Sequence, residues 1–154
     1  MSGGLVFSTG ASNGSIGRAL ALRFARAGYR LALVSRRVAE TETWARAQGF
    51  GPERAQVYLA DVTDPDAIAA AGRKCIALQG VPDVVIASAG ISVGMDTAER
   101  EDLDVMRDTF ATNNVGLAAT FRFSVRTLGR PPPGGRQRVH HLARDVAVQG
   151  LHRH

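Results

Sequence analysis

The sequence contains a single cysteine, Cys75, so one chain cannot form an internal disulfide. It has no apolar run of the length that crosses a bilayer, and Met1–Gly4 does not begin a basic and apolar leader with a cleavage site. These absences lead us to expect a cytoplasmic protein with no membrane partner. Cys75 falls within a helical pattern, which indicates a core or helix-surface thiol rather than a nucleophile.

Acidic residues are scarce only near the C-terminus. Residues 1–121 carry 12 Lys and Arg against 13 Asp and Glu, whereas residues 122–154 carry seven Arg against one acid. The formal net charge of +5 therefore belongs to the tail, and the rest has the composition of one near-neutral globular domain. The basic tail lacks the interleaved aromatics of many nucleic-acid binders, so nucleic acid is the weaker alternative; binding that falls steeply with salt would reveal it.

Short apolar runs alternate with helical patterns along the chain. Four runs are predicted to be buried strands: Leu5–Phe7, Tyr29–Ser35, Ala55–Ala60 and Asp83–Ser88. Between and after them we predict helices from about Ile16 to Ala27, at Val38–Gln48, from Pro65 to about Leu78, and from about Leu103 onward. Such alternation predicts an α/β fold, a Rossmann-like parallel sheet with flanking helices and strand order 3-2-1-4.

The stretch from Leu5 to Gly28 predicts a strand, a glycine turn and a helix whose N-terminus faces the turn. Ile16, Leu20, Phe24 and Ala27 recur at helical spacing, which places them on one face. Free backbone N–H groups at a helix N-terminus favour an anion such as a pyrophosphate. Gly10 would permit the tight turn, Gly14 the approach of phosphates, and Gly17 close packing of helix on strand. The alternative is a plain strand–loop–helix connection.

The sequence of this loop, TGASNGSIG, resembles the cofactor loop TGxxxGxG of the short-chain dehydrogenase/reductase family, with one extra residue in the last interval. The resemblance runs from Leu5 to about Phe123. It implies that a nicotinamide dinucleotide is held by the loop residues, namely Gly10, Ser12, Asn13, Gly14, Ser15, Ile16 and Gly17.

Arg36 and Arg37 follow the second predicted strand, where NAD-binding proteins of this architecture place an acid. A guanidinium at this point suits a 2′-phosphate through bidentate pairing, so the pair favours NADP(H) over NAD(H). The resemblance implies the same preference. A solvated basic pair is the alternative. Arg18, just after the loop, is a further candidate to add positive charge there.

Three more motifs carry the resemblance. Asp61 and Val62 follow the third strand, where the family contacts the adenine; a turn or cap aspartate is the alternative. Ser88-Ala89-Gly90 stands where the family has Asn-Ala-Gly. Asn113 lies in Asn113-Asn114-Val115-Gly116, which resembles the family's Asn-x-x-Gly, so the resemblance implies that Asn113 is a catalytic residue holding a water in the proton relay.

The family's catalytic Tyr-x-x-x-Lys is absent from this sequence. Its tyrosines are Tyr29 and Tyr58, its lysine is Lys74, and neither tyrosine has a lysine four residues later. We therefore expect residues 1–127 to form an incomplete NAD(P)-binding domain and 128–154 an irregular basic tail, through truncation or a frameshift. The tail holds all four histidines, but their spacing does not define a metal site, and we expect none.

The resemblance implies hydride transfer between nicotinamide and an unidentified small carbonyl or alcohol. The missing tyrosine and lysine keep two interpretations open, an oxidoreductase that is truncated or inactive and a non-catalytic NADP(H)-binding module. Without a fifth strand, the apolar edge at 84–86 would be open to pairing with other chains. We therefore expect self-association through this edge or through the long helix.

Overall fold

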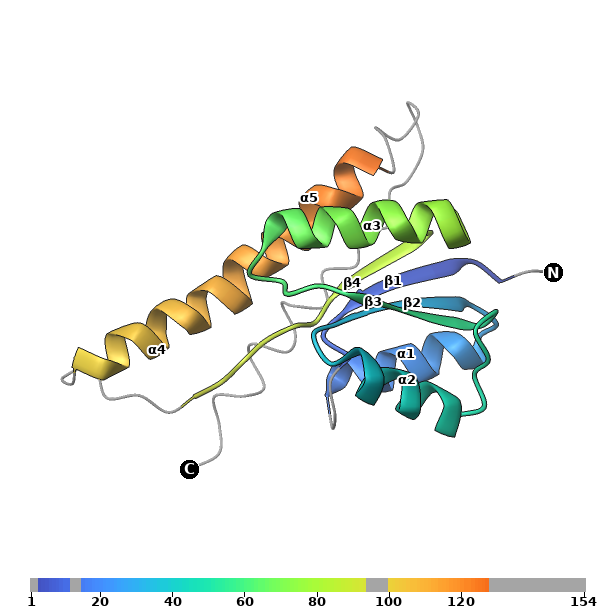
Figure 1. The fold of residues 1–154 in the computed structure, drawn as a ribbon, viewed down its shortest axis with the longest axis horizontal. Helices are drawn as coiled ribbons and strands as arrows, with labels where there is room; N and C mark the ends of the chain where they lie inside the picture. The colour runs from blue at the N-terminus through green and yellow to red at the C-terminus, as the bar shows by residue number, and fades with distance from the viewer. Residues whose placement is uncertain (1–2, 12–14, 94–99, 128–154) are drawn as a thin grey trace.

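The computed structural model describes residues 3–11, 15–93 and 100–127 (Figure 1). Ser12, Asn13 and Gly14, and the tail 128–154 with its histidines, lie outside the described residues. The elements in chain order are β1 (Leu5–Thr9), α1 (Ile16–Arg26), β2 (Arg30–Ser35), α2 (Val38–Ala47), β3 (Ala55–Leu59), α3 (Pro65–Gln79), β4 (Val84–Ala87), α4 (Arg100–Phe110), a π-helical stretch (Ala111–Val115) and α5 (Gly116–Thr127).

The four strands form one parallel sheet in the order β3-β2-β1-β4. Phe7 of β1 lies opposite Ala32 of β2 and Val85 of β4. Helices α1 and α2 cover one face of the sheet, and α3 covers the other with α5 beside it (Figure 1). The predicted fold class and strand order are confirmed.

The core has two halves, one on each face of the sheet. Leu5 and Phe7 join the α3 side together with Ile68 and Cys75, while Val6 joins the α1–α2 side. All five residues of β1 are buried, because this strand has a neighbour on both edges and helices on both faces. Burial raises the pKa of the Cys75 thiol to about 11, which agrees with its place as a core side chain.

Helix α1 packs on the sheet most closely through its small residues. Its buried residues are Gly17, Ala21 and Ala25, whereas Ile16 is 48% exposed. Leu20 and Phe24 of the predicted face are packed against the same side of the core, whereas Ile16 at the start of the helix is exposed. Small side chains let the helix approach the sheet closely, and that approach decided which residues are most buried.

Helix α3 begins as its sequence predicts. The Asp64 side chain accepts from the backbone N–H groups of Asp66 and Ala67, and Pro65 occupies the first helical position. The predicted long helix begins at Arg100 and contains the π-helical stretch. Its apolar residues Leu103, Met106 and Phe110 are 40–60% exposed on α4. Within the described ranges, no helix has the length and apolar character needed to span a membrane.

Candidate functional site

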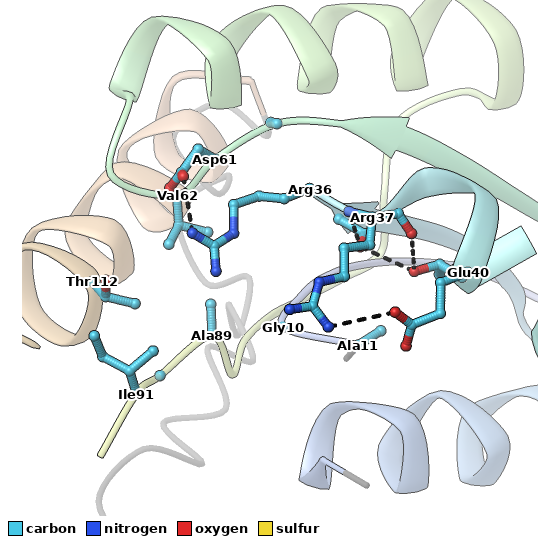
Figure 2. A pocket seen from close by; sticks show the side chains of 14 residues that line it. Gly10, Ala11, Arg36, Arg37, Glu40, Asp61, Val62, Ala89, Ile91 and Thr112 are labelled. Atoms are coloured by element: carbon cyan, nitrogen blue, oxygen red, sulfur yellow. Dashed lines mark hydrogen bonds and ion pairs between the residues drawn. The ribbon is translucent and has the colours of Figure 1, made fainter. Parts of the chain in front are cut away.

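A cavity of about 270 Å³ opens where the carboxyl ends of the four strands meet (Figure 2). Residues from every strand end line it, as expected for ligand sites in open parallel sheets. They are Gly10, Ala11, Ser35, Arg36, Arg37, Glu40, Thr41, Ala60, Asp61, Val62, Ala89, Gly90, Ile91 and Thr112. Among them are these residues predicted from the sequence: Gly10, Arg36, Arg37, Asp61, Val62, Ala89 and Gly90.

The glycine turn passes directly against the end of β4. Gly10 has a φ of +86°, and a Cβ added there would lie 2.3 Å from the backbone nitrogen of Ala89. A Cβ on Gly17 would lie 2.4 Å from the Gly10 carbonyl oxygen and 2.7 Å from Ser88 Oγ. The tight turn at Gly10 and the close packing at Gly17 are thus present, and only glycine fits at either position.

Ser15 and Ser88 hold this turn with their hydroxyl groups. Ser15 Oγ donates to the Gly10 carbonyl at 2.9 Å and accepts from the backbone N–H of Arg18, which makes Ser15 the N-cap of α1. Ser88 Oγ donates to the Thr9 carbonyl at 2.7 Å. Ser88 therefore connects the ends of β1 and β4. Ile16 and Gly17 begin α1 directly behind the turn.

Arg36 extends from the end of β2 to Asp61 at the end of β3. Its Nη1 lies 3.3 Å from Asp61 Oδ2, and the guanidinium side chain is 67% exposed. Asp61 Oδ1 accepts from the backbone N–H and the hydroxyl of Thr63. The Thr63 N–H foremost, with its hydroxyl and the Arg36 charge, holds the pKa of Asp61 below its ordinary value. Asp61 is therefore a turn aspartate that also lines the cavity.

Arg37 and Arg18 meet at one carboxylate, that of Glu40 in the first turn of α2. Arg37 Nη1 lies 3.5 Å from Oε2 and Arg18 Nη2 lies 3.3 Å from Oε1. Arg18 also donates from Nε to the Ala11 carbonyl, and its guanidinium lies 5.0 Å from the ring centroid of Trp44. Only 12% of the Arg18 side chain is exposed, so it braces the loop instead of projecting into the cavity.

Asn113 clamps the segment after β4 from the π-helical stretch. Its Oδ1 accepts from the Ile91 N–H at 2.8 Å and its Nδ2 donates to the Ile91 carbonyl at 2.9 Å. π-Helical turns often lie at functional sites, because they shift side chains out of the ordinary helical register. Here the stretch brings Thr112 to the cavity, which Ile91 also lines (Figure 2).

Neither tyrosine of the sequence lines the cavity. The Tyr58 hydroxyl donates to Gln79 Oε1 at 2.8 Å beneath α3, and burial raises its pKa above the ordinary value. Tyr29 packs edge to face against Phe24, with ring centroids 5.2 Å apart. Lys74 is exposed on α3. None of these residues is placed to exchange a proton with a ligand in the cavity.

The sequence analysis did not identify the other cavity residues, which are Ala11, Ser35, Glu40, Thr41, Ala60, Ile91 and Thr112. One signal for Glu40 was available, because it follows Arg37 by three residues, a spacing that lets helical side chains pair. Ile91 and Thr112 carry no such signal. They reach the cavity through the Asn113 clamp, which joins segments 22 residues apart.

A parallel sheet with a glycine turn before a helix and a cavity at the strand ends defines the Rossmann-like class of α/β proteins. Within this class, the model of the short chain dehydrogenase family matches residues 5–135. The chain belongs to this family.

Two relatives with similar sequences are named as oxidoreductases. An uncharacterized oxidoreductase from Myxococcus xanthus is 39% identical over 113 residues, which cover 73% of this chain and 44% of that protein. A probable oxidoreductase, EphD, from Mycobacterium tuberculosis is 38% identical over 56% of this chain and 14% of its own length.

Two solved structures share the fold. The short-chain dehydrogenase/reductase from Brucella melitensis superposes with a TM-score of 0.73 at 28% identity, over 82% of this chain and 52% of its own. An alcohol dehydrogenase from Thermococcus sibiricus, complexed with 5-hydroxy-NADP, gives 0.71 at 27% identity, over 81% of this chain and 53% of its own. The chain thus spans about half the length of these structures and less than half of the curated relatives.

Proposed function

We propose that this chain is the NADP(H)-binding part of a short-chain dehydrogenase/reductase. The observation that carries the proposal is a cavity bounded by the glycine turn before α1 and by two exposed arginines at the end of β2. A volume of about 270 Å³ lies just below the usual range of ligand pockets. One portion of a dinucleotide would lie inside it, with the remainder along the strand ends.

The residues at the turn fit the pyrophosphate of such a cofactor. Gly10 and Gly17 leave no space for a Cβ, because the turn packs directly against the end of β4 and the start of α1. The loop residues Ser12, Asn13 and Gly14 belong to the same proposal on the family resemblance, and Ser15 caps α1 behind them. Helix N-termini favour negative charge through their free N–H groups and dipole.

The residues at the end of β2 fit a 2′-phosphate. Strand β2 ends in Ser35, and the next two residues are arginines instead of the acid that would accept from a ribose hydroxyl. Arg36 and Arg37 are 67% and 74% exposed, and each pairs with a single carboxylate at the cavity. Exposed ion pairs contribute about 0.2–1 kcal/mol, so a phosphate can replace them at small cost. This supports NADP(H) over NAD(H).

The residues around the other side of the cavity fit the adenine and nicotinamide portions less specifically. Asp61 and Val62 line it at the end of β3, and Ala89 and Gly90 at the end of β4, with Ser88 behind them. We propose that Asn113 positions the cavity wall through Ile91. By family resemblance it would also hold a water for proton transfer.

When bound, the nicotinamide would supply the hydride for reduction of a carbonyl, or accept it from an alcohol. The chain's own part is to hold and orient this cofactor, because the acid/base pair Tyr-x-x-x-Lys is absent from the 154 residues. Hydride transfer is therefore proposed for the whole protein in which this part works. A non-catalytic NADP(H)-binding module is the second candidate, favoured by the burial of Tyr58 and its bond to Gln79.

Titration of the purified chain with NADPH and NADH tests the proposal. We expect saturable binding that prefers NADPH. Arg36→Ala should lower NADPH affinity about tenfold, the loss of one charge-assisted hydrogen bond, and change NADH affinity less than about twofold. Arg73→Ala, an exposed arginine on α3, is the control. Binding of neither dinucleotide, or a preference for NADH, would overturn the proposal.

Steady-state assays separate the two candidates. NADPH oxidation is followed with a series of small aldehydes and ketones at saturating cofactor. Turnover above the rate without protein would favour the oxidoreductase, whereas tight binding without turnover would favour the module.

Self-association is a related proposal about partners. In the described part of the sheet β4 pairs only with β1, and Leu103, Met106 and Phe110 on α4 are exposed. An open apolar strand edge promotes pairing between chains. Light scattering of the purified chain tests this, and a monodisperse monomer would contradict it.

A further inference from the structure

The wall of the cavity near β2 holds charges of both signs. Arg36 pairs with Asp61 and Arg37 pairs with Glu40, and all four residues line the cavity (Figure 2). The two arginines therefore do not face a ligand as free cations. A 2′-phosphate, which carries close to two negative charges, must compete with a carboxylate for each of them.

Glu40 differs from Asp61 in having two arginine partners of different character. Arg18 is fixed, since its side chain is 12% exposed, lies over Trp44 and donates to the Ala11 carbonyl. Arg37 is 74% exposed and lies slightly farther from the carboxylate, at 3.5 Å. Arg18 is thus the permanent partner of Glu40, and Arg37 is the partner that a phosphate can replace.

We propose that Glu40 is a specificity-determining residue that lowers the preference of the cavity for a 2′-phosphate by holding Arg37. This inference rests on the proposed NADP(H) site. When a 2′-phosphate binds, Arg37 leaves Glu40, and Arg18 remains to compensate the carboxylate. Binding of the phosphate therefore leaves Glu40 paired with Arg18, but it breaks the ion pair between Arg37 and Glu40.

A substitution of Asp61 would test the competition between carboxylate and phosphate for an arginine less clearly. Its other oxygen accepts from the backbone N–H and the hydroxyl of Thr63, so its removal also changes the turn after β3. Glutamine at position 40 keeps the shape of glutamate and an oxygen that can accept from Arg18. The substitution Glu40→Gln thus removes the charge that holds Arg37 and leaves the packing of Arg18 on Trp44 in place.

The experiment compares dissociation constants of NADPH and NADH for wild type and Glu40→Gln. We expect NADPH to bind about two- to fivefold more tightly to Glu40→Gln, the gain from releasing one exposed ion pair. NADH affinity should stay within about 1.5-fold, because NADH has no 2′-phosphate. Trp44 is the only tryptophan, so its fluorescence reports binding beside Arg18. Glu42→Gln, an exposed glutamate on the same helix, is the matched control.

A second background distinguishes the holding of Arg37 from simple charge repulsion. In Arg37→Ala protein the same Glu40→Gln substitution should change NADPH affinity less than about 1.5-fold. A full two- to fivefold gain in that background, or an unchanged NADPH-to-NADH ratio in Glu40→Gln alone, overturns the inference and leaves the NADP(H) site standing. Failure of wild type to bind either dinucleotide overturns both. Equal thermal unfolding midpoints confirm that the variants are folded.

Discussion

The polar groups at the two ends of the sheet differ in how exposed their contacts are. At the amino end, Gln79 accepts from the Tyr58 hydroxyl and donates to the Leu31 carbonyl, and Asp83 accepts from the Leu5 N–H. At the carboxyl end, the arginines after β2 are largely exposed and pair with carboxylates at the cavity rim. The first set joins elements permanently, whereas the second has partners that a ligand can replace. The carboxyl end thus has exposed ion pairs at the cavity in addition to fixed bonds such as that of Ser88 Oγ to the Thr9 carbonyl.

The largest expected effect tests whether the carboxyl end is the more tightly constrained. Gly10 and Gly28 have nearly the same φ, +86° and +90°, and lie at opposite ends of the sheet. A Cβ at Gly28 meets nothing within 4 Å, whereas at Gly10 it meets the backbone of Ala89. Gly28→Ala should cost only the backbone strain, about 1–2 kcal/mol of the free energy of unfolding. Gly10→Ala should cost about 4 kcal/mol or more and abolish NADPH binding.

Urea unfolding of both variants, with NADPH titration at low denaturant, measures this difference. Equal destabilisation by the two substitutions would show that the turn and the end of β4 are not in close contact.

A smaller effect is expected at the amino end. Gln79→Ala leaves the Tyr58 hydroxyl and the Leu31 carbonyl without their partner, which should cost about 2 kcal/mol of the free energy of unfolding. NADPH affinity should stay within twofold, because neither Tyr58 nor Gln79 lines the cavity. Chemical unfolding and a cofactor titration on the same sample measure both quantities.

Tyr58→Phe is the control for that substitution, since it removes one of the two hydrogen bonds and should cost about half as much. A large loss of NADPH binding in a folded Gln79→Ala protein would show that the two ends of the sheet are coupled.

The smallest effect concerns pH at the carboxyl end. The pKa of Asp61 is lowered in the folded chain, foremost by the Thr63 N–H and also by Arg36. Its contacts therefore stabilise the fold above the ordinary aspartate pKa of about 4, and this contribution is lost as pH falls through the lower folded value. Asp61→Asn should be less stable than wild type at pH 6, by less than about 1 kcal/mol, because the pair is exposed.

The difference in stability between wild type and Asp61→Asn should shrink toward pH 2, which urea unfolding at several pH values measures. Asp66→Asn, an exposed aspartate on α3, serves as the control. A difference that widens as the pH falls would mean that the folded chain does not favour the charged form of Asp61.

Local sequence patterns predicted the strands and helices well, but they did not predict which residues of α1 are most buried. The four strands agree with their apolar runs to within two residues at each end, and Asp64-Pro65 marks the start of α3. The residues predicted to share one face of α1 are buried unequally, with Leu20 and Phe24 against the core and Ile16 exposed. Periodicity reports which residues share a face, but the fit against β1 selected Gly17, Ala21 and Ala25 over Ile16.

The candidate site residues also divide into those that a local motif predicts and those whose contacts depend on the fold. Those named by a motif, such as Gly10, Arg36 and Asp61, line the cavity, because motif residues follow directly from strand ends. Arg18 was a candidate to add positive charge near the phosphates, and its guanidinium contacts Glu40, Ala11 and Trp44. Two of these partners, Glu40 and Trp44, come from α2, which sequence order alone does not bring to α1.

By itself, the sequence determined the α/β class, the strand order and the glycine turn, because each depends on residues that are adjacent or regularly spaced. The tertiary structure alone decided which polar groups of distant segments meet. Arg18 pairs with Glu40, Arg36 with Asp61, and Asn113 with Ile91 across 22 to 25 residues. Such pairs form only when parallel strands bring their carboxyl ends to one edge, since no local pattern records which side chains will face each other there.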